Sequence, residues 1–73
     1  MKTSELGLSA MNRILKKAGA ERVTHESANE LRRIVEDIAY EIAKNSIEMA
    51  KHAGRRTIRS EDVKLGSKSF SKY

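Results

Sequence analysis

Residues 24–53, THESANELRRIVEDIAYEIAKNSIEMAKHA, decide the fold because they form an uninterrupted run without a Gly or a Pro. The apolar residues of this run recur at spacings of three and four, which places them on one face of a helix. Thr24 is a candidate N-cap, and Gly54 is placed to end the helix at its C′ position. The pattern therefore predicts one long helix over residues 24–53.

A helix of this length spans about 45 Å, whereas a compact domain of 73 residues has a radius of gyration of roughly 11 Å. The chain is thus too short to cover the apolar face of its own helix. It contains no Cys, which excludes disulfides and thiolate zinc sites as sources of stability. We therefore expect a second copy of the chain to cover the face. The core between the two copies is predicted at four positions: Leu31, Val35, Ile38 and Ile42.

Two shorter amphipathic segments flank the long helix. Residues 8–18 form an apolar stripe, with Ser9 as a candidate N-cap and Gly19 as a C′ stop. Ser60 is a candidate N-cap of a last helix, which Gly66 weakens. The predicted architecture is all-α: short helix, loop, long helix, loop, short helix.

The domain boundaries follow from these elements. We expect a flexible N-terminal segment at residues 1–7, a single domain over residues 8–68, and a C-terminal tail at residues 69–73. No apolar run is long enough to span a membrane, and no signal-peptide core is present at the N-terminus. These features predict a protein that acts inside the cell, without a membrane partner.

The net charge of +5 is unevenly distributed along the chain. Residues 1–23 carry five bases against two acids, and residues 54–73 carry six against two. Residues 24–53 instead carry four bases against six acids. Positive charge concentrated at the two ends indicates a polyanionic partner, most often nucleic acid. The simpler alternative is that these charges only keep the protein soluble.

No residue pattern indicates catalysis. His25 and Glu26 begin like the zinc-protease motif HExxH, but Asn29 occupies the position of its second His. There is no Gly-rich phosphate loop and no combination of a nucleophile with a base and an acid. We expect no enzymatic activity, no metal, no cofactor and no small-molecule substrate.

The order of elements, together with two loop motifs, resembles the histone fold and most closely the archaeal histones. The motifs are RILKKAGAERV at residues 13–23 and AKHAGRRTIRSEDV at residues 50–63. They stand at the separation typical of that family, and the resemblance covers about residues 8–65. It implies an obligate, intertwined homodimer in which two long helices cross. The Arg22–Val23 segment of one chain would then pair with Thr57–Ile58 of the other as a short parallel β-bridge.

The resemblance also implies that the dimer binds and bends double-stranded DNA with little sequence preference. Arg22 would enter the minor groove, supported by Thr57, which is the backbone and deformability mode of recognition. The other implied contacts lie at or near phosphates: Arg13, Lys16, Lys17, Arg55, Arg56 and Arg59. The expected location is the chromosome, in the nucleoid of a cell without a nucleus.

The family further implies that dimers join through a small four-helix bundle, so that they compact DNA in nucleosome-like or extended assemblies. The matching positions are Met49, His52, Asp62 and Leu65, with His52 paired to Asp62 of the next dimer. Asp62 is also placed to pair with Arg55 of its own chain, so two partners are open to this carboxylate. A small residue at the position of Gly19 is associated with close stacking of successive turns.

The chain departs from the family pattern at two places. Gly7 and Ala10 stand where prolines are common, and the last helix runs into Gly66-Ser67-Lys68-Ser69 instead of continuing with more bases. Two alternatives therefore stand beside the wrapping histone. One is a histone-fold interaction subunit that pairs with a different chain and serves in a transcription or repair complex, whereas a paralogous histone is a further partner of the DNA-binding histone itself. The other is a histone that bridges or coats DNA without wrapping it.

Overall fold

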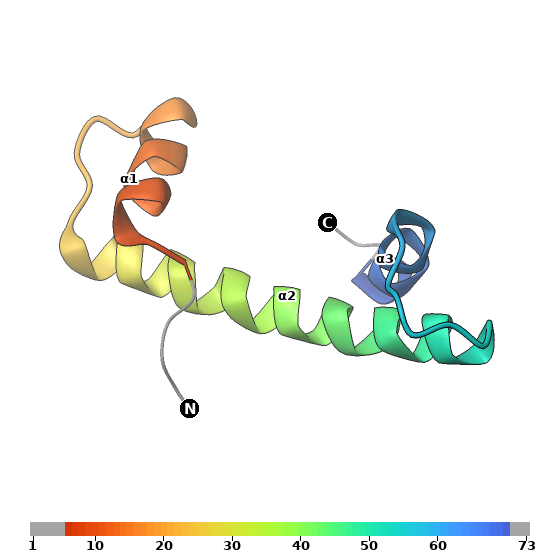
Figure 1. Ribbon diagram of the computed structural model, residues 1–73. Helices are drawn as coiled ribbons and strands as arrows, with labels where there is room; N and C mark the ends of the chain where they lie inside the picture. Colours follow the sequence, from red (N-terminus) through yellow and green to blue (C-terminus); the bar gives the residue numbers. More distant parts are fainter. Residues whose placement is uncertain (1–5, 71–73) are drawn as a thin grey trace. The chain divides into compact units, whose positions relative to one another are not determined.

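The computed structural model describes residues 6–70, with Ser69 and Phe70 described by their backbone alone. The described residues form three α-helices and a 3-10 helix and contain no strand (Figure 1). These elements are α1 (Leu8–Lys17), α2 (His25–His52), α3 (Ser60–Gly66) and η1 (Ser67–Phe70). The predicted all-α class and element order are confirmed. The predictions for residues 1–5 and 71–73 lie outside the described residues.

The start of α2 is fixed by the predicted cap. The hydroxyl of Thr24 accepts a hydrogen bond from the backbone N–H of Ser27 at 3.0 Å, which satisfies one of the free donors of the first turn. Glu26 adds a carboxylate to this positive end, and Lys51 and His52 add bases to the last turn. The helix covers 28 residues, close to the predicted range.

Glycines end the first two helices as predicted. Gly19 and Gly54 have φ angles of 118° and 73°, in the region that favours Gly. After α1, the N–H groups of Gly19 and Ala20 donate to the carbonyls of Lys16 and Leu15. After α2, the same two bonds are repeated by the N–H groups of Gly54 and Arg55. This is the Schellman motif, and it gives each loop a defined starting direction.

Two predicted caps are wrong. Helix α1 begins at Leu8 with Gly7 at the N-cap, so Ser9 lies within the helix. Helix α3 begins at Ser60 itself, and its N-cap is Arg59, whose backbone N–H donates to the Asp62 carboxylate at 2.8 Å. At the start of α3, the carboxylate of Asp62 in the first turn therefore makes the capping hydrogen bond that the sequence pattern assigns to the Ser60 hydroxyl.

The chain divides at Asp37 and Ile38 into two compact units, which share the continuous helix α2. In the N-terminal unit, Met11 of α1 and Ala28 of α2 are buried. The backbone N–H of Leu6 donates to the Glu36 carboxylate at 2.7 Å, which ties the entry to α1 onto α2. This unit carries little apolar core of its own.

The C-terminal unit is held together largely by polar groups. The largest fully buried side chains among the described residues are Asp62 and Ser46, at 2% and 1% exposure. The Asn45 amide donates to the Gly66 carbonyl at 3.2 Å, and the Ser46 hydroxyl donates to the Ile42 carbonyl at 2.7 Å. The Asn45 bond fixes the end of α3 against α2, whereas the Ser46 bond stays within α2.

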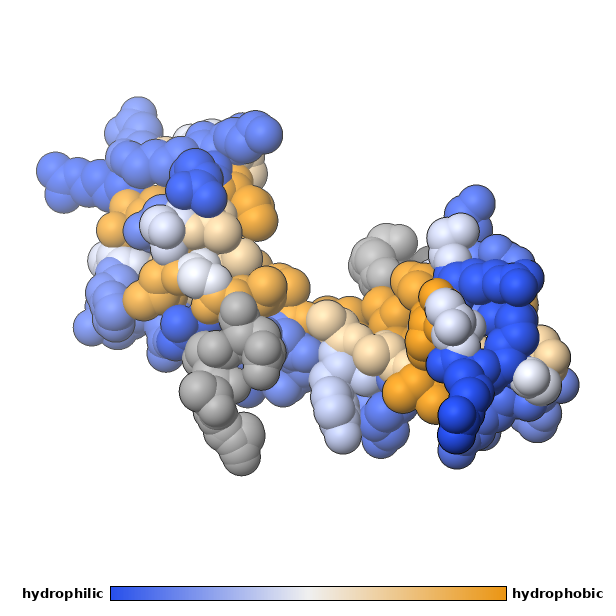
Figure 2. All heavy atoms as spheres, in the orientation of Figure 1, coloured by the Kyte–Doolittle hydropathy of each residue, from blue (hydrophilic) through white to orange (hydrophobic). Residues whose placement is uncertain are grey.

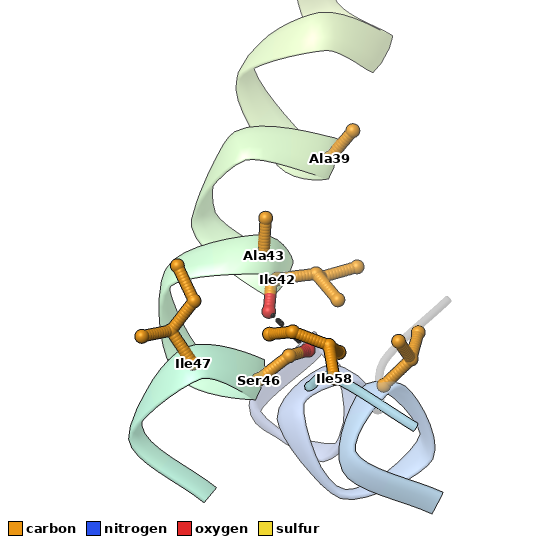
Figure 3. A pocket seen from close by; sticks show the side chains of 7 residues that line it. Ala39, Ile42, Ala43, Ser46, Ile47 and Ile58 are labelled. Carbon is orange, nitrogen blue, oxygen red and sulfur yellow. Dashed lines mark hydrogen bonds between the residues drawn. The ribbon is translucent and has the colours of Figure 1, made fainter. Parts of the chain in front are cut away.

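Beside these polar contacts, an apolar groove of about 460 Å³ remains open. It is lined by Ala39, Ile42, Ala43, Ser46, Ile47, Ile58 and Val63, and Figure 3 shows these side chains around it. Hydrophobic surface is visible in Figure 2 where α3 meets the later turns of α2. Ile47 and Val63 are exposed in the single chain. An exposed apolar groove of this kind indicates a surface that another chain covers.

Candidate nucleic-acid interface

The basic face of α1 consists of Arg13, Lys16 and Lys17, all of them exposed. The Lys16 ammonium donates to the Glu21 carbonyl at 3.1 Å, and Arg22 follows in the same loop. Within residues 6–70, no ion pair involves Arg13, Lys17 or Arg22. In Figure 2 the C-terminal end of α1 presents hydrophilic surface. The N-terminal unit therefore offers uncompensated positive charge to an anionic partner.

The loop between α2 and α3 is organised around Asp62. The Arg55 guanidinium binds its carboxylate in a bidentate manner, with Nη1–Oδ2 and Nη2–Oδ1 distances of 2.8 and 2.9 Å. Arg55 Nη1 also donates to the Thr57 carbonyl at 3.0 Å. The backbone N–H of Arg59 completes the set at Oδ2. A single buried carboxylate thus binds two residues of the loop, Arg55 and Arg59, and Arg55 in turn holds Thr57.

These contacts change the pKa of both partners. Hydrogen bonding from Arg55 is the main cause that lowers the pKa of Asp62 from its ordinary value of 3.8 to about 2. The Arg59 backbone N–H adds to this lowering, and burial opposes it. The same hydrogen bond raises the pKa of Arg55. The pair is therefore ionised at neutral pH.

This geometry separates the predicted contacts of the second loop into two groups. The Arg55 side chain is only 21% exposed, and its guanidinium donates to the Thr57 carbonyl and the Asp62 carboxylate. Its observed role is therefore to hold the loop. Arg56, Thr57 and Arg59 are exposed. Arg59 lies 3.9 Å from Glu61, and a solvent-exposed pair of this length contributes little. Arg56 and Arg59 are thus available to an anion.

Charges on α2 largely compensate one another. Arg33 lies between Glu30 and Asp37, at 2.5 and 3.6 Å. Lys44 lies 3.7 Å from Glu41 on the same helix. Arg33 also lowers the pKa of Glu30 through its hydrogen bond. These i,i+3 and i,i+4 pairs leave α1 and the loops as the positively charged regions of the chain.

The residues predicted to form the dimer core, Leu31, Val35, Ile38 and Ile42, are all half-buried in the single chain. None of them reaches the burial that is typical of core aliphatic residues. Ile14, Ile34 and Leu65 remain more exposed still. The apolar side of α2 is therefore only partly covered by α1 and α3.

The residues predicted to join dimers lie in different environments. Met49 is half-buried, His52 is exposed, and Leu65 is 51% exposed. Of the two partners open to Asp62, Arg55 of the same chain occupies both carboxylate oxygens. Oδ1 accepts one hydrogen bond among the described contacts, and pairing with His52 of a neighbouring dimer stays a prediction.

Gly19 lies at an open part of the surface. A Cβ at this position would meet no atom within 4 Å, although its φ of 118° disfavours other residues. The predicted β-bridge between Arg22–Val23 and Thr57–Ile58 involves a second chain. Within the single chain both segments lie in loops. Both predictions therefore depend on an assembly.

Sequence reasoning missed how the end of α3 is held. Ser46, Asn45 and Gly66 form this contact, whereas the sequence pattern predicts only that Gly66 weakens the helix. The signal was present, because a Gly inside a helix often marks a close approach of two backbones. Within the described part of the chain, no group of three or more His, Cys, Asp or Glu residues is placed to hold a metal. No helix there is long and apolar enough to cross a membrane.

The sequence matches, over residues 4–66, the family described as "Histone-like transcription factor (CBF/NF-Y) and archaeal histone". It is 42% identical over 66 residues to an archaeal histone HAN1 subunit from Thermococcus zilligii, across 90% of this chain and 98% of that protein. It is 48% identical over 61 residues to probable archaeal histone 3 of Methanocaldococcus jannaschii, across 84% and 91% of the two chains. Both loop motifs lie inside the matched range.

The Asp62 carboxylate gives a testable pH dependence. Its pKa is lower in the folded than in the unfolded chain, so its contribution to the free energy of unfolding is complete above about pH 4 and disappears as the pH falls through about 2. We expect Asp62→Asn to be less stable than the parent at neutral pH. The difference should shrink between these two values, as measured by urea unfolding at fixed protein concentration.

The matched control is Glu61→Gln, which removes the exposed neighbouring carboxylate. We expect its free energy of unfolding to follow that of the parent within experimental error across the same range. A difference in the free energy of unfolding between Asp62→Asn and the parent that stays constant between about pH 5 and about pH 2 would contradict the role of the buried pair.

Proposed function

The chain belongs to the family of histone-like transcription factors and archaeal histones, and on this premise we propose that it forms a homodimer that wraps and compacts duplex DNA. Membership of the family supports the coarser statement directly: this is a histone-fold, DNA-binding chromatin protein. Wrapping, the contact residues and the growth of the assembly are the parts that we propose. The place of action would be the chromosome.

The observation that carries the proposal is the coexistence of an uncovered apolar side on α2 with uncompensated bases outside α2. The groove of about 460 Å³ and the half-buried aliphatic residues call for a second chain. The bases of α1 and of the first loop form no ion pair among the described residues, and Arg56 and Arg59 of the second loop are exposed, whereas Arg55 is bound to Asp62. A dimer would carry each of these basic groups twice, along one surface for one polyanion.

On that surface, Arg22 would enter the minor groove where it faces the protein, and Thr57 of the partner would support it. Arg13, Lys16, Lys17, Arg56 and Arg59 would contact phosphates on either side. Arg55 would act through its bonds to Asp62 and Thr57, which keep the loop in shape. Contacts to the backbone and the minor groove carry little sequence information, so the chain would bind most sequences.

Dimers would join through Met49, His52, Asp62 and Leu65, at the end of α2 and on α3. The exposure of His52 and Leu65 supports this, because an apolar side chain and an imidazole are free for a neighbour. The open surface at Gly19 supports close stacking of successive turns. Repetition of the contact would extend the assembly along DNA.

A second candidate is a subunit that pairs with a different histone-fold chain. It is favoured by the relatives of the chain: the family includes histone-like transcription factors, and the relative from Thermococcus zilligii is named as a subunit. This candidate predicts that the lone chain binds DNA weakly and that an added partner restores binding. DNA titration of the lone chain distinguishes it from the homodimer.

The role of Arg22 is testable by comparing it with an arginine outside the proposed surface. We expect Arg22→Ala to weaken binding to several unrelated duplexes by a similar factor, of about tenfold for a loss of about 1.4 kcal/mol. Arg33→Ala is the matched control, since Arg33 is paired with Glu30 and Asp37 on α2. Fluorescence anisotropy against salt concentration supplies the measurement.

For the parent, log affinity should fall steeply and linearly with log salt, with a slope of about 0.9 for each neutralised phosphate. An affinity that is insensitive to salt would argue against DNA binding through these bases. An Arg22→Ala variant that changes which sequence is preferred, without a general loss, would argue against the minor-groove role.

Growth of the assembly is tested by digesting long duplex DNA saturated with the protein, using micrococcal nuclease. We expect protected lengths that increase in regular steps, because dimers would add one after another. A single short protected length would contradict the dimer–dimer contact and leave isolated dimers. No protection at any ratio would contradict wrapping and favour a bridging protein or the interaction subunit.

A further inference from the structure

Gly66 lies where no larger residue fits. A Cβ at this position would stand 2.7 Å from the Ser46 hydroxyl, 2.9 Å from the Ser46 backbone N and 3.0 Å from the Ile42 carbonyl O. The last two atoms belong to the backbone of α2 and cannot rotate away. Any side chain at residue 66 would therefore force α3 to move outward from α2, because interiors resist even one added methyl group.

The same two residues of α2 line the apolar groove. Ile42 and Ser46 of α2 line the groove together with Val63 of α3, and Figure 3 labels the Ile42 and Ser46 side chains beside it. Val63 lies one turn before Gly66 on the same short helix. A shift of α3 that relieves a side chain at residue 66 would thus also displace the wall of the groove.

From this shared geometry we propose that Gly66, seated on Ser46, sets the width of the apolar groove and so determines how tightly a second copy of the chain is held. The proposal rests on the proposed function, because the second copy is the occupant of the groove. Gly66 is a positioning residue: it acts on the second copy through Val63 and Ile42, without touching that copy itself.

Ser46 and Asn45 of α2 form the site on which Gly66 rests. Ser46 is 1% exposed, and its hydroxyl is turned back to the Ile42 carbonyl, where it satisfies itself without a group from α3. The Asn45 amide donates to the Gly66 carbonyl at the end of α3. The end of α3 is consequently pinned both by close approach and by a hydrogen bond, and the groove is shaped before a partner arrives.

The test is the dimer dissociation constant of the full chain, measured by dilution with sedimentation and far-ultraviolet circular dichroism. Helix propensity alone predicts that Gly66→Ala strengthens α3 and the dimer. The proposal predicts the opposite sign, with a dissociation constant increased by about tenfold or more, as expected for overpacking. Lys64→Ala is the control on the same helix, because Lys64 is exposed and does not line the groove, so its dissociation constant should stay close to that of the parent.

A rescue variant separates this role from a general loss of stability. Ser46→Ala removes the nearest obstacle, so the double variant Ser46→Ala/Gly66→Ala should recover part of the affinity lost by Gly66→Ala. Independent effects would instead add. An unchanged or tighter Gly66→Ala dimer, or effects that simply add, would overturn the proposal. A parent chain that stays monomeric at every concentration would overturn the homodimer, and the groove's role with it.

Discussion

Everything in this structure depends on the mismatch between the long helix α2 and the small amount of chain available to cover it. Helices α1 and α3 cover only parts of its apolar side, so few apolar side chains are buried: Met11, Ala28 and Ala50 among the described residues. Three small or flexible side chains cannot offset the conformational entropy lost on folding. The single chain thus forms only part of a hydrophobic core, and apolar surface from another chain is needed to complete it.

Polar contacts replace packing where the single chain must hold its shape. The Arg55–Asp62 pair fixes the loop between α2 and α3, and the Ser46–Gly66 contact fixes the end of α3. A buried ion pair gives little net stability by itself but specifies one arrangement of its partners. These contacts leave Ile47, Ile58 and Val63 at the groove exposed, and they leave the side chains of Arg56 and Arg59 at the surface. Polar contacts thus hold the shape of the single chain, and the exposed apolar and basic side chains serve the proposed function.

Local features of the structure were predictable from the sequence, and tertiary ones were not. The bounds of α2, the cap at Thr24 and the stops at Gly19 and Gly54 follow from periodicity and backbone preference, which neighbouring residues determine. The family was also predictable, since its two loop motifs are local and are confirmed by the comparisons. The sequence left two partners open for Asp62, and the structure selects Arg55. The close contact of Gly66 with Ser46 depends on how α3 meets α2, which no local pattern encodes. The wrong caps at Ser9 and Ser60 have the same origin, because the path of the entering chain selects the N-cap.

The central claim is that a second copy of this chain covers the groove on α2. An isotope-filtered nuclear Overhauser experiment on a mixture of labelled and unlabelled copies tests it most directly. The account predicts contacts between chains to the methyl groups of Ile42, Ile47 and Val63, which line the groove. A folded sample that shows these methyl groups in contact only with their own chain would contradict it.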